Sequence, residues 1–264
     1  MEKETCKTLL KIITNKKYVH FVSRGNEAIK IALAITKTLG RTNCLIQEEG
    51  GWLKYEKFIK DVYMEPIRLV TNYGLIFEKE LKYHSHDSVL LLNSLAGYIV
   101  MHDMAKVYDA CILNDIFLIN DVSGSIGTEE AKFGEILLGS FGIDKPVNLG
   151  EGGFIAFDDE SWQDFLKDVE EPQLNYKLLE DVLKNLPERR RKLLNISKKV
   201  KEDLKDYNIV HKEADGINVV VKFSNEEEKQ KLINYCKQNN YEYTLCPREI
   251  RILDDAVSIE IKRL

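Results

Sequence analysis

Helical and strand-like patterns of hydrophobic residues alternate along roughly the first 165 residues. Apolar residues at Ala28, Ile31, Ala32 and Ile35 have the i, i+3, i+4, i+7 spacing of a helix face. This spacing predicts a helix over residues 26–38. The alternation continues with a helix around 53–63, a helix over 101–115, and strands over 43–46, 66–70, 88–92, 116–120, 137–140 and 153–157. Such alternation predicts a mainly parallel sheet, covered by helices on both faces and joined by right-handed crossovers.

A charged helical region follows, and the pattern then becomes strand-rich. Helical periodicity covers 176–186 and 188–205, with Pro187 at the junction, where proline suits a first helical turn. The remainder predicts a helix over 225–239 and strands over 207–211, 216–223, 242–246, 249–253 and 256–262. The predicted fold class is therefore α/β, with a mainly parallel central sheet and a small C-terminal α+β domain. We expect a large domain over 1–165, connecting helices over 166–206 and a small domain over 207–264.

Composition narrows the class of protein. The chain has 264 residues, 44% of them hydrophobic, and a formal net charge of −5, which gives no general case for nucleic-acid or membrane binding. The N-terminus is polar and no apolar run approaches a membrane span, so we expect a cytoplasmic protein without a signal peptide. The five cysteines are scattered without paired spacing. This spacing argues against a disulfide scaffold and a zinc site, and we expect no bound metal.

The segment from Ser140 to Gly153, SFGIDKPVNLGEGG, has the most distinctive chemistry. Lys145 lies there between a Ser-Phe-Gly turn and a glycine-rich turn. A lysine amine becomes nucleophilic when it is desolvated or placed near another cation, and it can then form an imine with an aldehyde. The glycines would let the backbone pass close to a bound ring. The alternative interpretation is a surface hairpin with an ordinary lysine.

Two segments earlier in the sequence could also contribute to a ligand site. Asp121 follows a buried strand, and ligands in open α/β sheets bind at the carboxyl ends of strands. A carboxylate there could keep a ring nitrogen protonated, although a lone Asp after a strand can also be a helix cap or turn former. Gly25 and Asn26 begin a helix, whose free N–H groups could bind phosphate. The alternative for that segment is an ordinary helix start.

Together, these segments resemble the large domain of fold-type I pyridoxal-phosphate enzymes, and most of all the DegT-type aminotransferases. That family has Ser-Phe-His-x-x-Lys and then Gly-Glu-Gly-Gly around its Schiff-base lysine. Lys145 falls on this lysine, and Ser140 falls on the serine that helps to hold the cofactor phosphate. Asp121 falls on the aspartate that pairs with the pyridine nitrogen, and Gly25 and Asn26 fall on the phosphate turn.

The resemblance covers roughly residues 18 to 160 and implies further roles. It implies pyridoxal 5'-phosphate as the cofactor, a small amino compound as the substrate, and aminotransferase activity with Lys145 and Asp121 as catalytic residues. It places Trp52 against the cofactor ring. Arg24, before the phosphate turn, could reach the phosphate or a substrate carboxylate. The family's glutamine after the aspartate is absent here, and its contact to the ring hydroxyl could come from one of three residues: Ser123, Ser125 or Asn93.

Other functions stay open beside transamination. The protein sets the outcome of this chemistry through substrate orientation, so a lyase or a β-replacement enzyme is an alternative. A non-catalytic cofactor-binding protein is another, because a fold does not guarantee activity. The basic run from Lys184 to Lys205, with Arg189 to Lys192 at its centre, could bind RNA phosphates, as in an enzyme for a tRNA-bound amino acid. A solvated face of a connecting helix is the favoured interpretation of this run.

Two further expectations concern the substrate and the assembly. A substrate carboxylate suits the fork-shaped guanidinium of arginine, and Arg248 and Arg251 are candidates, expected on the same side of a strand. The alternative is that both are edge-strand charges on a solvated face. The resemblance implies a homodimer with active sites at the subunit interface. Tyr73 could reach the partner's site, or it could be a turn tyrosine packed on its own subunit.

Overall fold

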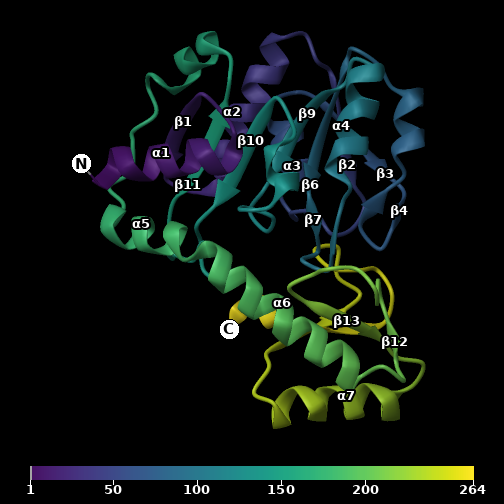
Figure 1. Ribbon diagram of the computed structural model, residues 1–264. Coiled ribbons are helices and arrows are strands. Elements are labelled where there is room, and N and C mark those ends of the chain that lie inside the picture. The colour runs from purple at the N-terminus through teal and green to yellow at the C-terminus, as the bar shows by residue number, and fades with distance from the viewer. Residues whose placement is uncertain (1) are drawn as a thin grey trace.

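The computed structural model describes residues 2–264, which form two main sheets joined by helices (Figure 1). The large sheet has seven strands, and four of its six pairings, from β10 through β9, β6 and β2 to the edge strand β3, are parallel. Only β11 pairs antiparallel, with β10 on one side and β1 on the other. In spatial order the strands are β1 (Tyr18–Val22), β11 (Gly153–Phe157), β10 (Ile136–Ser140), β9 (Phe117–Asp121), β6 (Ser88–Asn93), β2 (Asn43–Gln47) and β3 (Glu65–Leu69). The predicted fold class is confirmed.

Helices cover both faces of this sheet because its central strands are apolar on both sides. On β6, Val89 and Leu91 pack beneath α2 (Gly25–Thr38) and α3 (Tyr55–Asp61). The alternate residues Leu90 and Leu92 pack beneath α4 (Met104–Leu113) on the opposite face. The helices α1 (Glu2–Thr14) and α5 (Tyr176–Lys184) cover the β10–β11–β1 end of the sheet. The sequence analysis did not predict α1.

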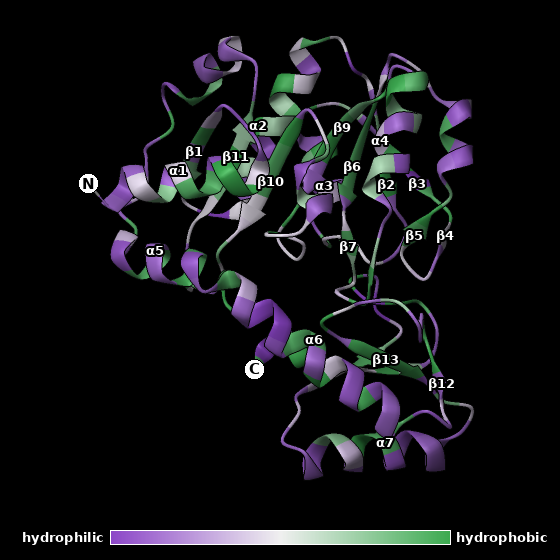
Figure 2. Cartoon of the chain, viewed as in Figure 1, coloured by the Kyte–Doolittle hydropathy of each residue, from purple (hydrophilic) through white to green (hydrophobic). Residues whose placement is uncertain are grey.

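The small sheet is entirely antiparallel, with the order β12 (Asn208–Ile209), β13 (Val219–Lys222), β15 (Ala256–Ile259) and β14 (Tyr243–Cys246). Its apolar face packs against α6 (Leu186–Asp203) and α7 (Glu226–Gln238), whose outer faces are hydrophilic (Figure 2). The exact domain boundaries stay a prediction. Among the described residues, no helix combines the length and the apolar character that a membrane crossing needs.

The strand predicted over 249–253 is wrong. That segment is a turn, in which Arg251 N–H donates to the carbonyl of Arg248 and Arg248 N–H donates to that of Ile252. The chain must reverse there so that β15 can pair antiparallel with β14, and Pro247 has no N–H for a strand ladder.

Short elements complete the structure. Two small hairpins pair β4 (Thr71–Asn72) with β5 (Leu75–Ile76) and β7 (Leu95–Ala96) with β8 (Val100–Met101). The turn of the second hairpin contacts the small-sheet region, where the Tyr98 carbonyl accepts N–H bonds from Ile217 and Asn218. The 3-10 helices are η1 (Glu78–Tyr83), η2 (Glu129–Lys132), η3 (Glu160–Leu166) and η4 (Ile261–Arg263).

Candidate active site

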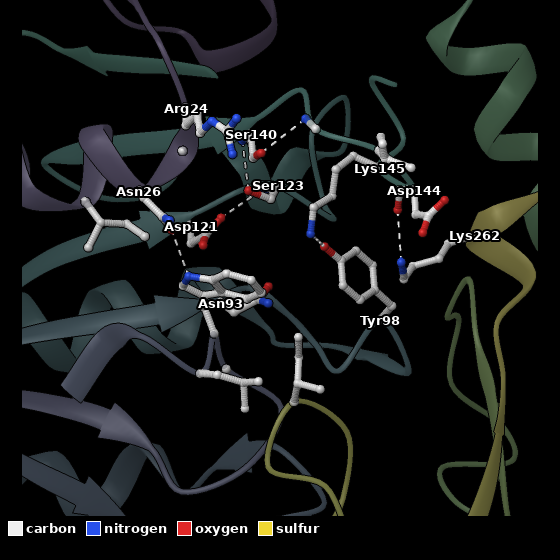
Figure 3. Close-up of a pocket in the computed structure, with 18 of the residues that line it drawn as sticks. Arg24, Asn26, Asn93, Tyr98, Asp121, Ser123, Ser140, Asp144, Lys145 and Lys262 are labelled. Atoms are coloured by element: carbon white, nitrogen blue, oxygen red, sulfur yellow. Dashed lines mark hydrogen bonds between the residues drawn. The ribbon is translucent and has the colours of Figure 1, made fainter. Parts of the chain in front are cut away.

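A pocket of about 480 Å³ lies between the two sheets. The large-sheet side contributes the start of α2, the ends of β9 and β10, and the loop after β10. The C-terminal side contributes Arg248, Arg251 and Lys262, of which Lys262 is labelled in Figure 3. A volume of this size suits a small-molecule ligand, and the ends of parallel strands are the usual place for one in an α/β sheet.

The start of α2 and the end of β10 form a cradle for an anion. A Cβ atom on Gly25 would lie 2.8 Å from the Cβ of Ser140, so only glycine allows the helix to approach this closely. The first intrahelical bond runs from Glu27 N–H to the Arg24 carbonyl. The earlier N–H groups, of Gly25 and Asn26, are therefore free of helix bonds, as at any helix start.

Hydrogen bonds fix Ser140 in this cradle. Its N–H donates to Ser123 Oγ at 2.9 Å, and its own Oγ accepts from Gly142 N–H at 3.2 Å. Arg24 is exposed at the rim and lines the same pocket. Two backbone N–H groups, a hydroxyl and a guanidinium thus line the same part of the chain's pocket, and together they are a suitable donor set for a phosphate.

Asp121 is 5% exposed at the carboxyl end of β9, and two donors orient its carboxylate. Tyr55 OH donates to Oδ2 at 2.6 Å, and Ser123 N–H donates to Oδ1 at 3.0 Å. Burial, together with the charge of Asp121, raises the pKa of Tyr55 well above its ordinary value, so Tyr55 stays a donor. The remaining lone pairs of Asp121 are available to a cation in the pocket, such as a protonated ring nitrogen.

Trp52 forms one wall of the pocket. It is partly buried against the α2–α3 core, and its Nε1 donates to Asn26 Oδ1 at 2.9 Å. Its ring centroid lies 5.9 Å from Lys145 Nζ. An indole fixed in this way offers a flat apolar surface beside the lysine, as a bound aromatic ring would require.

Lys145 reaches into the pocket from the loop after β10, where its Nζ donates to Tyr98 OH (Figure 3). Burial acts to lower the pKa of this lysine. The Tyr98 oxygen and the charge of Asp121 outweigh burial, and the pKa lies above its ordinary value. The free amine is therefore held as an ammonium, and it must lose a proton before it can act as a nucleophile.

Asn93 and Ser123 line the pocket, but their polar groups already have partners within the chain. Asn93 Oδ1 accepts from Leu95 N–H at 3.2 Å, and Ser123 Oγ accepts from Ser140 N–H. A ligand contact to either would share these groups. Ser125 is fully buried and bonds to the hydroxyl of Ser94.

The two arginines predicted for the substrate have different environments. Arg251 is 3% exposed, and its Nε and Nη2 donate to the two carboxylate oxygens of Glu260 at 2.8 and 2.6 Å. Arg248 is exposed and lines the pocket. The expectation that both share one side of a strand is wrong because they are in a turn, in which Arg251 N–H donates to the Arg248 carbonyl, although both still line the pocket.

Two other sequence candidates are engaged within the chain. Tyr73 OH donates to Asp254 Oδ2 at 2.9 Å, so its contacts are those of a turn tyrosine packed on its own subunit. In the basic run, Arg190 is buried and donates to the Gly124 carbonyl at 2.9 Å, while Lys184 and Lys205 pair with acidic neighbours on the helix surface.

Sequence analysis did not identify Tyr55, Tyr98 or Lys262 as pocket residues. Tyr55 is indistinguishable in the pattern from the apolar Phe58 and Ile59 on the same helix face. Tyr98 follows Gly97 in a hairpin turn and has φ of 66°, a value that no pattern of apolar residues reports. In the sequence, Lys262 looks like a surface charge near the end of the chain. Only the folded small sheet brings it to the pocket.

Comparisons with known proteins agree with this architecture. Residues 187–264 match the MJ1341 family C-terminal domain. No curated protein matches the chain. Among solved structures, 3-amino-5-hydroxybenzoic acid synthase is similar at a TM-score of 0.74 and 14% identity, over 99% of this chain and 85% of that one.

Two further solved structures give the same result. A DegT DnrJ EryC1 StrS aminotransferase from Brucella abortus has a TM-score of 0.75 and 13% identity, over 98% of this chain and 84% of that one. NtdA from Bacillus subtilis, with bound cofactor PMP, has a TM-score of 0.75 and 16% identity, over 100% of this chain and 74% of that one. The chain shares the fold of these proteins, and the resemblance predicted from the sequence is confirmed at that level.

Proposed function

We propose that this protein binds pyridoxal 5'-phosphate and is an aminotransferase for an amino acid or another small amino compound. One observation carries the proposal. The anion cradle at Gly25 and Ser140, the oriented carboxylate of Asp121 and the amine of Lys145 meet in one pocket. These are the groups that the phosphate, the ring nitrogen and the aldehyde of this cofactor would need. Matching structures that contain the cofactor or its amine form support it.

The residues of the pocket fit the cofactor. Gly25 lacks a Cβ where the backbone must approach Ser140, so the N–H groups at this helix start could bind a phosphate beside Ser140. Trp52 would lie against the ring. When bound, pyridoxal phosphate supplies an aldehyde for covalent attachment and a ring that withdraws electrons. Asp121 would hold a proton on the ring nitrogen and so keep that ring cationic.

Lys145 has two functions in this proposal. Its amine would carry the cofactor, and Tyr98 OH would position that amine through their hydrogen bond. Lys145 Nζ would also be the base that takes a proton from the substrate α-carbon and returns it to another atom. The phosphate cradle would fix orientation, which aligns that carbon with Nζ.

We further propose a homodimer whose partner subunit covers the pocket mouth. Leu53 and Ile143 both line the pocket and are 52% and 70% exposed, which is more apolar exposure than a closed site would leave. Light scattering at micromolar concentration tests the assembly. A monomer that binds the cofactor fully would contradict this part of the proposal.

Reduction with borohydride tests the main proposal. Pyridoxal phosphate is added to the purified protein, the imine is reduced, and peptides are mapped by mass spectrometry. The expected result is a pyridoxyl group on Lys145 alone. Label on another lysine, or no label, would refute the assignment. An absorbance band near 420 nm before reduction, lost on adding an amino acid, would then rank the amino donors.

A further inference from the structure

Lys262 is a second buried lysine in the pocket that contains Lys145. It is 5% exposed and lies at the C-terminal wall, in η4. Its Nζ donates to the Asp144 carbonyl at 3.0 Å and lies 4.8 Å from the Tyr98 ring centroid. Figure 3 shows both lysines beside Tyr98, with Lys145 at its hydroxyl and Lys262 bonded to Asp144. The two amines therefore share one aromatic neighbour.

The turn that carries Tyr98 is held in an uncommon conformation. Its φ of 66° is in the left-handed region, and its carbonyl accepts two N–H bonds, from Ile217 and Asn218. Strained residues held by their surroundings are frequent at functional sites. Here the backbone bonds fix the ring between the amine of Lys145 and that of Lys262.

The acidic groups near Lys262 form ion pairs with neighbouring arginines and not with its amine. Within the described residues, no ion pair includes Lys262, whereas its neighbours Arg251 and Arg263 each pair with carboxylates. Helix α6 also packs against η4, but its buried Arg190 and Lys201 are bonded elsewhere, to backbone carbonyls. The groups facing Lys262 are Arg251 from the turn, Glu260 and Arg263 from its own segment, Asp144 and Lys145 from the loop after β10, and Tyr98 from the hairpin.

This environment favours the neutral amine. Burial lowers the pKa of Lys262 to about 7, and the nearby charge of Arg251 adds to the effect. By contrast, the pKa of Lys145 is raised. Near neutral pH, Lys262 is thus the lysine of the pocket that exists in both protonation states, as an efficient acid–base group requires.

We propose that Lys262 is a second acid–base residue of this pocket, which exchanges a proton with an oxygen of the bound substrate. The proposal rests on the proposed function and adds a substrate class to it. Because Lys145 would act at the carbon that bears the amino group, the oxygen that Lys262 serves belongs to a neighbouring carbon of the amino compound, as a carbonyl or hydroxyl group. In one direction the Lys262 ammonium gives one proton to a carbonyl oxygen while Lys145 Nζ takes one from the adjacent carbon that bears the amino group, so a C–H bond breaks, an O–H bond forms and the charge of the substrate does not change. Lys262 regains its proton from solvent, Lys145 releases its proton there, and no electrons are gained or lost.

Competitive acetylation tests the amine directly and does not depend on cofactor or activity. The full chain, without added cofactor, is treated with a trace of acetic anhydride at pH 5 to 10, and the peptide containing Lys262 is quantified. The expected midpoint for Lys262 is near pH 7. Lys167, exposed and paired with Asp164, is the reference, because this pair raises its pKa above the ordinary value. A Lys262 midpoint above pH 9, or no reaction at any pH, overturns the proposal.

Variants of the cofactor-loaded protein test the catalytic role. Each common amino acid is added, and the rate of loss of the cofactor band is measured against pH. Lys262→Met should keep the band, lower the rate by about a hundredfold and remove an inflection near pH 7. Lys262→Arg keeps a positive charge but should not restore the inflection. The matched control is Lys201→Met, which removes a buried lysine from α6, outside the pocket.

The outcomes of the two experiments separate the two proposals. If Lys262→Met keeps the inflection, the acid–base role is refuted even when the rate falls, because a structural role alone would leave the pH profile in place. If wild-type protein shows no cofactor band, the failure lies with the proposed function. The acetylation midpoint of Lys262 still decides whether the pocket contains a neutral amine that a ligand can reach.

Discussion

The two walls of the pocket are built in different ways. On the large-sheet wall, each polar group is at the end of a regular element, with Asp121 after β9, Ser140 at the end of β10 and Gly25 at the start of α2. On the C-terminal wall, the groups come from a turn and a short 3-10 helix, and a buried ion pair between Arg251 and Glu260 holds them. The first wall follows from the parallel sheet, whereas the second depends on how the small sheet docks.

This difference suggests that the two walls have different functions. Strand ends and a helix start are fixed by backbone hydrogen bonds, so they suit the parts of a ligand that must not move, such as a phosphate and a ring. The C-terminal wall is free of such ladders and carries the cations that would face a substrate. Changes in the first wall should therefore affect cofactor binding and the chemistry at the cofactor, and changes in the second should affect stability and the handling of the substrate, including the proton transfer proposed for Lys262.

The largest effect is expected for Lys145→Ala. Without this amine, no covalent attachment of the proposed cofactor can form, and borohydride reduction should leave no pyridoxyl group on the chain. The measurement is the intact mass after reduction. Lys262→Met is the control, because a lysine of the other wall should not be needed for attachment, and its mass should rise by one pyridoxyl group. Equal labelling of the Lys145→Ala variant would break the distinction between the walls.

Asp121→Asn should be next in size. The amide has nearly the same shape as the carboxylate, so the fold should be kept, but the negative charge that stabilises a cationic ring is lost. We expect the turnover rate to fall by roughly 10²- to 10³-fold, the range for loss of one oriented electrostatic group. Steady-state rates and the cofactor band are measured, with the exposed Asp109→Asn on α4 as control. A normal rate would mean that this strand end is not part of the chemistry.

The same contrast explains what could be predicted from the sequence. Lys145, Asp121 and Ser140 are in short segments whose order and spacing are informative, because a few consecutive residues determine each turn. Tyr98 and Lys262 approach one another only after residues far apart in the chain have folded, with Lys262 bonded to a carbonyl 118 positions away. The predicted strand over 249–253 is wrong for a related reason, since alternation along five residues does not report a required chain reversal.

Breaking the Arg251–Glu260 ion pair should have the next largest effect, and the quantity affected should be the stability of the fold. Arg251→Met would remove the bidentate cation from the Glu260 carboxylate, which is 1% exposed. The carboxylate would keep the neutral donors Asn218 and Ser258 and the more distant Arg263. Breaking a buried pair in this way costs about 3–5 kcal/mol in the free energy of unfolding, measured by urea denaturation at pH 7. The double variant Arg251→Met/Glu260→Leu should recover part of the loss. No loss in the single variant would show that the C-terminal wall does not depend on this pair.

The ion pair also predicts a pH dependence. Burial alone would raise the pKa of Glu260, but the hydrogen bonds and charge of Arg251 outweigh it and lower the pKa to about 2. A carboxyl group with a lowered pKa contributes stability that is fully present above its unfolded-state pKa, about 4.3, and is lost as the pH falls towards 2. The wild-type free energy of unfolding should therefore fall over that interval. Glu260→Gln should lack this component of the acid dependence.

The smallest effect is expected for Tyr55→Phe. Tyr55 supports the large-sheet wall indirectly, through its hydrogen bond to Asp121. Its hydroxyl is the buried donor to Asp121 Oδ2, and the variant keeps the ring that packs in the core. Loss of one hydrogen bond to a charged acceptor should cost about 1.5–3 kcal/mol of stability, and a less strictly oriented carboxylate should slow turnover about tenfold. Tyr63→Phe, at an 88% exposed tyrosine, is the control for the substitution itself. If Tyr55→Phe loses stability but not rate, Ser123 N–H alone orients Asp121, and the rigidity of this wall resides in the backbone.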